Sequence, residues 1–312
     1  MTSASLPSAA QTRRVLALST IAGIGIYRPP ADAPLARRVS GSDLTGVSYR
    51  VQAQSGVTTA SLAAGAARAA LKAAGTDPTT LEMIVVGTTT PDVLWPSTAC
   101  LVQTELKLPM VASFDLYAAE TSLLTALNVA THYVTAGARS VLVIGAESDN
   151  QLVDLSGQGA GVHGRAAAAI VLTAGANDGG IVSTLVGGSA RSELNGDTQD
   201  RILLRGLADG VAECLKKAGL SMAEIDLVIG EQSAPEIMHA WAKASGLPAS
   251  RLLVQPARYG ALLAAAPLIA LHDAVRDGRL RSGMTALLIQ CGSGQAWGAA
   301  CVRWGRGGLV EW

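Results

Sequence analysis

Residues 71–91 read LKAAGTDPTTLEMIVVGTTTP, and residues 215–235 read LKKAGLSMAEIDLVIGEQSAP. The two stretches align without a gap, with Gly75 opposite Gly219 and Pro91 opposite Pro235. Each pattern predicts the end of an amphipathic helix, a glycine that stops it, a short connection and a buried strand rich in branched residues. The match therefore indicates an internal duplication of one α/β unit.

A second matched pair extends the duplication. GARSVLVIG at 137–145 corresponds to GMTALLIQC at 283–291, and both predict a turn that leads into an apolar strand. Apolar runs without alternation are typical of strands covered by helices on both faces. We expect helices at 60–74, 121–136, 205–217, 234–245 and 264–275. We predict two pseudo-symmetric halves, residues 15–175 and 176–312, after a flexible leader at residues 1–14.

The composition fits a large buried core. The chain has 312 residues, of which 49% are hydrophobic and only 15% are charged. Part of the apolar surface is expected to lie in a subunit interface. The 24 basic and 24 acidic residues leave no net charge, which argues against a nucleic-acid or polybasic membrane surface. A small molecule or another protein is the expected partner.

The four cysteines show neither a CxxC pair nor metal-ligand spacing, and neither do the four histidines. This pattern predicts reduced core cysteines in a cytoplasmic protein, with no metal and no cofactor. Arg13 and Arg14 before the apolar run 15–27 imitate a secretion signal. Because Gly23 and Gly25 interrupt that run and no A-x-A site follows, a buried first strand is the preferred interpretation. No apolar run has the length of about 20 residues that a membrane span needs.

Several stretches resemble a known family. Duplicated α/β halves with helices between two sheets resemble the thiolase fold. The closest resemblance is to β-ketoacyl-ACP synthase III, through GTTTPDVLWPSTACLVQ (87–103), FDLYAAE (114–120), VLVIGAE (141–147) and CGSGQAWGAACVRW (291–304). The resemblance runs from about Val15 to Trp304 and implies an α/β fold of two halves, packed as a five-layered αβαβα sandwich.

The resemblance also identifies candidate site residues. The family's nucleophile motif is D-x-x-A-A-C before a helix, where the helix N-terminus depresses the pKa of the thiol. Here the motif runs from Asp115 to Glu120, so Glu120 stands where the family has its Cys. A carboxylate cannot form the acyl thioester on which Claisen condensation depends.

The other two triad positions also differ from the family pattern. Glu231 stands at the His of the family's H-Q-A-N stretch, and Ala261 stands at the Asn of its H-G-N-T-S stretch. The resemblance thus implies a degenerate Cys-His-Asn triad. Gly292, Ser293 and Gly294 keep the small residues whose backbone N–H groups help to form the family's oxyanion hole. The alternative is that this loop is only a tight turn.

Two departures concern substrate binding. Residues 41–57 lack the family's Trp–Arg clamp on the CoA adenine. Glu236 stands where the family has a basic residue that helps to receive the carrier protein, so an acidic carrier would be repelled. The resemblance also places Trp95 at the position that reaches across a dimer interface into the partner's acyl pocket.

Two hypotheses follow for the pair Glu120 and Glu231. They are remnants in a non-condensing partner subunit of an intact ketosynthase III paralogue, in fatty-acid, polyketide-type or specialised acyl metabolism. Alternatively, they are a new acid/base pair in an acyl-transfer enzyme that acts on an acyl thioester, since adjacent carboxylates separate their pKa values. In either case we expect a dimer, formed with a second copy or with the paralogue, and neither nucleic acid nor membrane as a partner.

Overall fold

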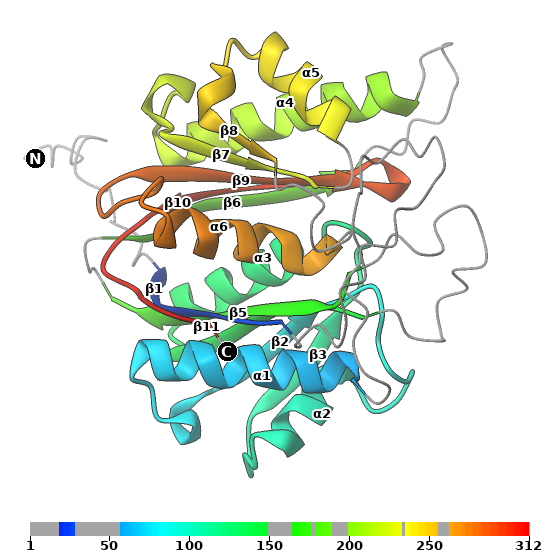
Figure 1. The fold of residues 1–312 in the computed structure, drawn as a ribbon, viewed down its shortest axis with the longest axis vertical. Coiled ribbons are helices and arrows are strands. Elements are labelled where there is room, and N and C mark those ends of the chain that lie inside the picture. The colour runs from blue at the N-terminus through cyan, green and yellow to red at the C-terminus, as the bar shows by residue number, and fades with distance from the viewer. Residues whose placement is uncertain are drawn as a thin grey trace, which may run out of the picture.

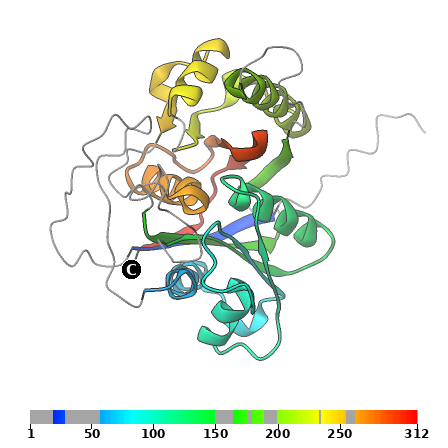
Figure 2. The same cartoon turned by 90° about the vertical axis from the view of Figure 1, so that its right-hand side faces the viewer.

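The computed structural model describes residues 19–28, 57–148, 164–175, 179–188, 199–232, 235–254 and 262–311. Its elements form five layers, which confirms the predicted sandwich (Figures 1 and 2). One outer layer holds α1 (Thr59–Ala74) and α2 (Thr98–Glu105). The middle layer holds α3 (Ser122–Thr135) and α6 (Ala266–Arg276), and the other outer layer holds α4 (Gln199–Ala218) and α5 (Pro235–Ala244).

The strands between these layers follow the order β3-β2-β4-β5-β1 in the first half and β6-β10-β9-β7-β8 in the second. Among the described residues, the two runs are joined by the pairing of Ser19 of β1 with Ile181 of β6. The last strand, β11, returns to pair with β1. The strands are β1 (Ser19–Tyr27), β2 (Met83–Gly87), β3 (Ala112–Leu116), β4 (Ser140–Glu147), β5 (Ala166–Ala174), β6 (Gly180–Gly188), β7 (Leu227–Gly230), β8 (Leu252–Val254), β9 (Thr285–Gly292), β10 (Ala296–Arg303) and β11 (Gly308–Glu311).

The duplication is confirmed in the backbone. Gly75 ends α1 with φ 60°, and Gly219 ends α4 with φ 68°. At each end the glycine N–H and the next N–H donate back into the last turn, to the carbonyls of Lys72 and Leu71 in one half and of Lys216 and Leu215 in the other. Glycine occupies this left-handed position without the steric cost of a Cβ atom.

Two carboxylates fix the helix starts of the outer layer beside the first half. Asp92 accepts hydrogen bonds from the backbone N–H groups of Thr59 and Ala60 at 2.7 and 2.8 Å. Asp115 at the end of β3 accepts from those of Thr98 and Ala99 at 2.6 and 2.8 Å. Each side chain satisfies N–H groups that have no partner within the helix and complements the helix dipole. Asp115 of the predicted nucleophile motif is therefore an anchor for α2.

The helix predictions hold with two differences. α4 begins at Gln199, six residues before the predicted start, because Ile202 and Leu203 continue its apolar face. The predicted helix at 264–275 divides into a 3₁₀ turn at Leu263–Ala265 and then α6, whose second residue is Pro267. Proline lacks an N–H group and fits the first turn of a helix but not its interior.

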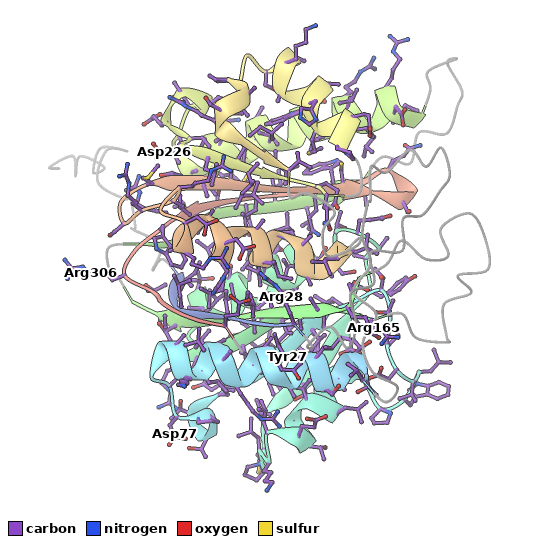
Figure 3. All side chains as sticks on the ribbon, viewed as in Figure 1. Tyr27, Arg28, Asp77, Arg165, Asp226 and Arg306 are labelled. Carbon is purple, nitrogen blue, oxygen red and sulfur yellow. The ribbon has the colours of Figure 1, made fainter. Side chains whose placement is uncertain are left out.

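Three of the four cysteines lie in the core, as predicted. All four are free, and Cys214, Cys291 and Cys301 are buried, whereas Cys100 is only partly buried. At the end of β1, Arg28 forms an ion pair of 3.0 Å with Asp273 of α6, which ties the first strand to the middle layer (Figure 3). Within the described ranges, no helix combines the length and the apolar character that crossing a membrane requires. The predicted leader, residues 1–14, lies outside the described residues.

Candidate functional site

Glu120 lies in the sharp turn between β3 and α3. Ala119 before it has φ 48°, a left-handed conformation that is uncommon for a residue with a Cβ atom. Hydroxyl groups support the turn: Ser122 Oγ accepts from the Ala118 N–H at 2.8 Å, and Thr121 Oγ1 donates to the Ala118 carbonyl at 2.7 Å. The turn thus places Glu120 two residues before the first residue of α3.

The Glu120 side chain reaches the second half of the molecule. Its Oε2 accepts a hydrogen bond from the Ser293 N–H at 2.8 Å, and its Oε1 accepts one from Ser293 Oγ at 2.9 Å. Ser293 begins the tight connection between the antiparallel strands β9 and β10, where Gly294 and Gln295 have φ 70° and 55°. The structure therefore brings together Glu120 and the Gly292–Gly294 loop, two of the candidate site regions that the resemblance indicated.

Gly292 leaves the space that the Glu120 carboxylate fills. A Cβ atom at this position would overlap the carboxylate and lie 2.7 Å from Glu120 Cγ. With φ 176°, the backbone at Gly292 is extended, a conformation that any type of residue can adopt. Glycine is therefore required here because a Cβ atom would collide with the Glu120 carboxylate, and not because of the local backbone conformation.

Unusual backbone conformations gather around this contact. Among the described residues, four non-glycine residues have positive φ: Ala119 and Gln295 lie in the two turns that carry Glu120 and Ser293, Leu263 lies in the turn before α6, and Lys107 follows α2. Gln290 connects the first turn of α3 to the turn at Leu263, because its Oε1 accepts from the Leu124 N–H at 3.1 Å and its Nε2 donates to the Leu263 carbonyl at 3.3 Å. Such conformations concentrate at functional sites, where the surrounding structure holds them.

The second predicted acid, Glu231, is placed directly after β7 and is only 1% exposed. The charges of both Glu231 and Glu120 affect the pKa of Cys291, the residue before Gly292. Burial raises the pKa of the Cys291 thiol, and the negative charges of Glu231 and then Glu120 raise that pKa further. The thiol is therefore held in its neutral form and is not an available thiolate nucleophile.

The third predicted position, Ala261, lies outside the described residues. The loop that follows it is held from two sides. Gln232 Oε1 accepts from the Leu262 N–H at 2.9 Å, and Gln290 binds the carbonyl of Leu263. The segment after Ala261 thus packs between the ends of β7 and β9.

Glu147, at the end of β4, has a role that the sequence interpretation missed. It is fully buried, and its Oε1 accepts from the backbone N–H groups of Thr89 at 3.0 Å and of Ala264 at 3.4 Å. Its Oε2 accepts from the hydroxyls of Thr89 and Thr90 at 2.7 and 2.9 Å. Burial raises the pKa of Glu147 to about 7, although these hydrogen bonds lower it. The only sequence signal was an acid closing an otherwise apolar strand.

Trp95 lies in the connection between β2 and α2 and is 85% exposed. The residues before it, Val93 and Leu94, are exposed as well, and so are Met110 and Tyr117 on either side of β3. β3 ends the strand order of the first half, so one side of this strand has no neighbour within the described sheet. We call Val93, Leu94, Trp95, Met110 and Tyr117 the edge patch.

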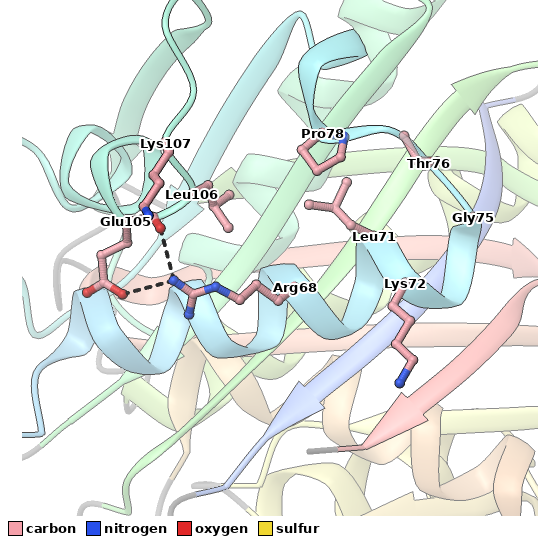
Figure 4. A pocket seen from close by; sticks show the side chains of 9 residues that line it. All are labelled: Arg68, Leu71, Lys72, Gly75, Thr76, Pro78, Glu105, Leu106 and Lys107. Carbon is pink, nitrogen blue, oxygen red and sulfur yellow. Dashed lines mark hydrogen bonds and ion pairs between the residues drawn. The ribbon is translucent and has the colours of Figure 1, made fainter.

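A separate open groove of about 640 Å³ lies between the C-terminal ends of α1 and α2 (Figure 4). Leu71, Leu106 and Pro78 form its apolar side, and Arg68 binds the carboxylate of Glu105 at its rim at 3.4 Å. None of the predicted site residues lines this groove.

Comparisons with known proteins agree with this architecture. A family model described as 3-oxoacyl-[acyl-carrier-protein (ACP)] synthase III matches residues 114–190, and a model of the C-terminal part of that enzyme matches residues 215–304. A β-ketoacyl-[acyl-carrier-protein] synthase III of Methylococcus capsulatus is 34% identical, over 92% of this chain and 99% of its own length. This chain belongs to the β-ketoacyl-ACP synthase III family.

Other members of the family show the same extent of similarity. The β-ketoacyl-[acyl-carrier-protein] synthase III of Aquifex aeolicus is 33% identical, over 91% of this chain and 99% of the relative. A crystal structure of 3-oxoacyl-[acyl-carrier-protein] synthase III from that organism superposes with a TM-score of 0.79 at 31% identity, covering 92% of this chain and all of the other. The corresponding structure from Thermus thermophilus gives 0.78 at 29% identity. The thiolase-like α/β fold is therefore confirmed.

Proposed function

We propose that this protein is a synthase III-like member of fatty-acid, polyketide-type or specialised acyl metabolism that does not catalyse condensation itself. It acts instead as the non-condensing partner subunit of an intact ketosynthase III paralogue. The observation that carries this proposal is the contact of the Glu120 carboxylate with the N–H and hydroxyl of Ser293. An anionic side chain thus occupies the Ser293 N–H, in the loop whose backbone N–H groups help to form the family's oxyanion hole for the acyl substrate.

The chemistry of the neighbouring groups supports a loss of condensation. Condensation begins with attack of a thiolate on an acyl thioester, and Glu120 carries no thiol. Cys291 is not a substitute, since burial and the two carboxylates raise the pKa of its thiol. Glu231, at the position assigned to the family's His, is an acid where the family uses a hydrogen-bond donor to the thioester enolate. Ala261, at the position of the Asn, has no polar side-chain atom.

A partner role accounts for the edge patch. Trp95 and Leu94 are 85% and 71% exposed, which is unfavourable for a monomer in water. They lie in the connection that leads from β2 to α2, and β3 is the last strand of the first half in the described sheet, so its outer edge could pair with another chain. Two subunits joined along this edge, as a homodimer or with the paralogue, would bury both features. Trp95 would then contribute to the acyl pocket of the partner.

One observation favours a second candidate function. Two non-glycine residues with a left-handed backbone, Ala119 and Gln295, lie in the turns that carry Glu120 and Ser293, and the charges of two carboxylates raise the pKa of the same thiol. Retained strain is typical of a working site. The second candidate is therefore an acyl-transfer or acid/base enzyme that acts on an acyl thioester through Glu120 and Glu231.

The test compares the chain alone with the chain plus an intact synthase III from the same genome. Acetyl-CoA and malonyl carrier protein are supplied, and the β-ketoacyl product is measured. We expect no product from the chain alone. We also expect none from Glu120→Cys, because Glu231 and Ala261 leave the enolate without donors. Co-purification of the two chains is expected; condensation by the chain alone would refute the proposal.

A further inference from the structure

The hydroxyl of Ser293 is paired with a base in an accessible place. Its Oγ donates to Glu120 Oε1 at 2.9 Å, and Ser293 is exposed while Glu120 is half-buried. A serine hydroxyl within hydrogen-bond distance of a carboxylate has the geometry of a nucleophile and its general base. The family comparison assigns nothing to this side chain; only the backbone of the loop was considered as an oxyanion hole.

We propose that Ser293 Oγ is an acyl-accepting nucleophile, with Glu120 as its general base and an acyl thioester such as an acyl-CoA as the donor. This activity goes beyond the partner role, in which neither residue reacts. It would give the subunit its own covalent acyl group, held as an oxygen ester.

The reaction balances without an oxidant or a metal. Ser293 Oγ attacks the thioester carbonyl while Glu120 Oε1 takes the hydroxyl proton. The carbon–sulfur bond then breaks, the proton passes from Glu120 to the departing thiolate, and an acyl-serine ester and a free thiol remain. No group other than the thioester is consumed.

The surrounding structure holds the base in position for this step. The Ser293 N–H binds Glu120 Oε2 at 2.8 Å and leaves Oε1 on the hydroxyl, so the carboxylate cannot rotate freely. The left-handed turns at Ala119 and Gln295 fix the two loops that carry the pair. The positive end of the α3 dipole begins at Ser122, two residues after Glu120, and stabilises negative charge that develops nearby.

The chain contains a matched pair without these surroundings. Ser221 donates through its N–H and its Oγ to Glu224 Oε2, both at 2.8 Å. Both residues are exposed, and they form a local capping box at the start of a 3₁₀ turn. The Ser221 pair therefore controls for exposure and for the hydrogen bond itself. It lacks the strained loops and the long helix beside Glu120.

The experiment incubates the full chain with acetyl-CoA or octanoyl-CoA and follows the intact mass, with peptide mapping of any adduct. We expect one acyl group on the peptide that contains Ser293, and none in Ser293→Ala. Glu120→Gln should slow labelling about 100-fold, the usual scale for a general base. Gly292→Ala should slow it as well, because the new methyl displaces the carboxylate while both reacting groups remain. Ser221→Ala should label at the wild-type rate.

Circular dichroism and urea denaturation establish that each variant is folded. An unlabelled wild-type chain, an adduct on another residue, or full labelling of folded Glu120→Gln overturns the proposal. These outcomes leave the partner role intact, because that role is tested by condensation in the presence of the paralogue.

Discussion

The duplication places Glu147 and Ser293 at equivalent points, two residues beyond the matched stretches 137–145 and 283–291. Each reaches the opposite half: Glu147 accepts from the N–H of Ala264, and Ser293 donates to Glu120. Glu147 at the end of β4 is nevertheless fully buried among four hydrogen-bond donors, whereas Ser293 at the end of β9 is exposed to solvent. The same supersecondary unit thus forms a structural anchor in one half and an accessible site in the other.

The largest difference between the two strand ends should be in stability. Glu147→Ala removes the acceptor of the buried Ala264 N–H and the partly buried Thr89 N–H and opens a cavity, so we expect a loss of about 4 kcal/mol in the free energy of unfolding. Ser293→Ala should cost less than about 1 kcal/mol, because water can reach the groups it leaves. Urea denaturation measures both. Equal losses in the free energy of unfolding at the two positions would contradict the conclusion that Glu147 is a structural anchor and Ser293 is not.

The same anchor should make stability depend on pH. The folded-state pKa of Glu147, about 7, lies above its ordinary value of 4.5, so the folded chain keeps a proton that the unfolded chain has lost between these values. The stabilisation that the protonated Glu147 gives the folded state is fully present below about pH 4.5 and falls as the pH rises to 7. Above pH 7 the free energy of unfolding no longer changes through this group. The loss is roughly 3 kcal/mol at 1.36 kcal/mol per pH unit.

Glu147→Gln is the control for this slope. The amide oxygen can still accept from the two backbone N–H groups, and the amide NH₂ can donate to the hydroxyls of Thr89 and Thr90, which also act as acceptors. The variant should stay folded and lose the dependence that Glu147 contributes. An unchanged slope in Glu147→Gln would show that another group is responsible.

A smaller difference in stability is expected between alanine substitutions at two glycines, one near each strand end. A Cβ at Gly145 would overlap the backbone of Ala264, whereas a Cβ at Gly292 meets the movable side chain of Glu120. Gly145→Ala should therefore cost about 2 kcal/mol, as expected for an overpacked core, and Gly292→Ala less than about 1 kcal/mol. Thermal unfolding of both variants checks this order. A greater loss from Gly292→Ala would mean that Glu120 is fixed as rigidly as backbone.

The edge patch should affect association and not folding. Trp95 contacts little of its own chain, so Trp95→Ala should leave the free energy of unfolding of a single subunit within about 0.5 kcal/mol of the wild-type value. It should weaken association, with a second copy or with the paralogue, at least about tenfold, since buried tryptophans dominate interfaces. Analytical ultracentrifugation gives the dissociation constants. An unchanged constant would place the interface elsewhere.

The fold could be predicted from the sequence because its signals are local and occur twice. Gly75 and Gly219 mark equivalent helix ends, and the matched strands carry the same apolar runs. The meeting of Glu120 with the loop at Ser293 followed from the family resemblance. The hydrogen bonds of that pair, between residues 173 apart in the chain, did not, because no local pattern encodes them.

Glu147 was missed for a related reason. One acid at the end of an apolar strand has no spacing partner in the sequence, and its four donors come from two distant loops. Only the packed structure shows that burial and these donors define its environment.

The central claim is that this chain accompanies a condensing subunit without condensing. Its most direct test is a mixture of this protein with a synthase III paralogue whose nucleophilic cysteine has been replaced by alanine. Malonyl carrier protein and acetyl-CoA are supplied to this mixture and to one with the unaltered paralogue. The account predicts β-ketoacyl product only where the paralogue keeps its cysteine. Product from the altered mixture would show that this chain condenses and would contradict the account.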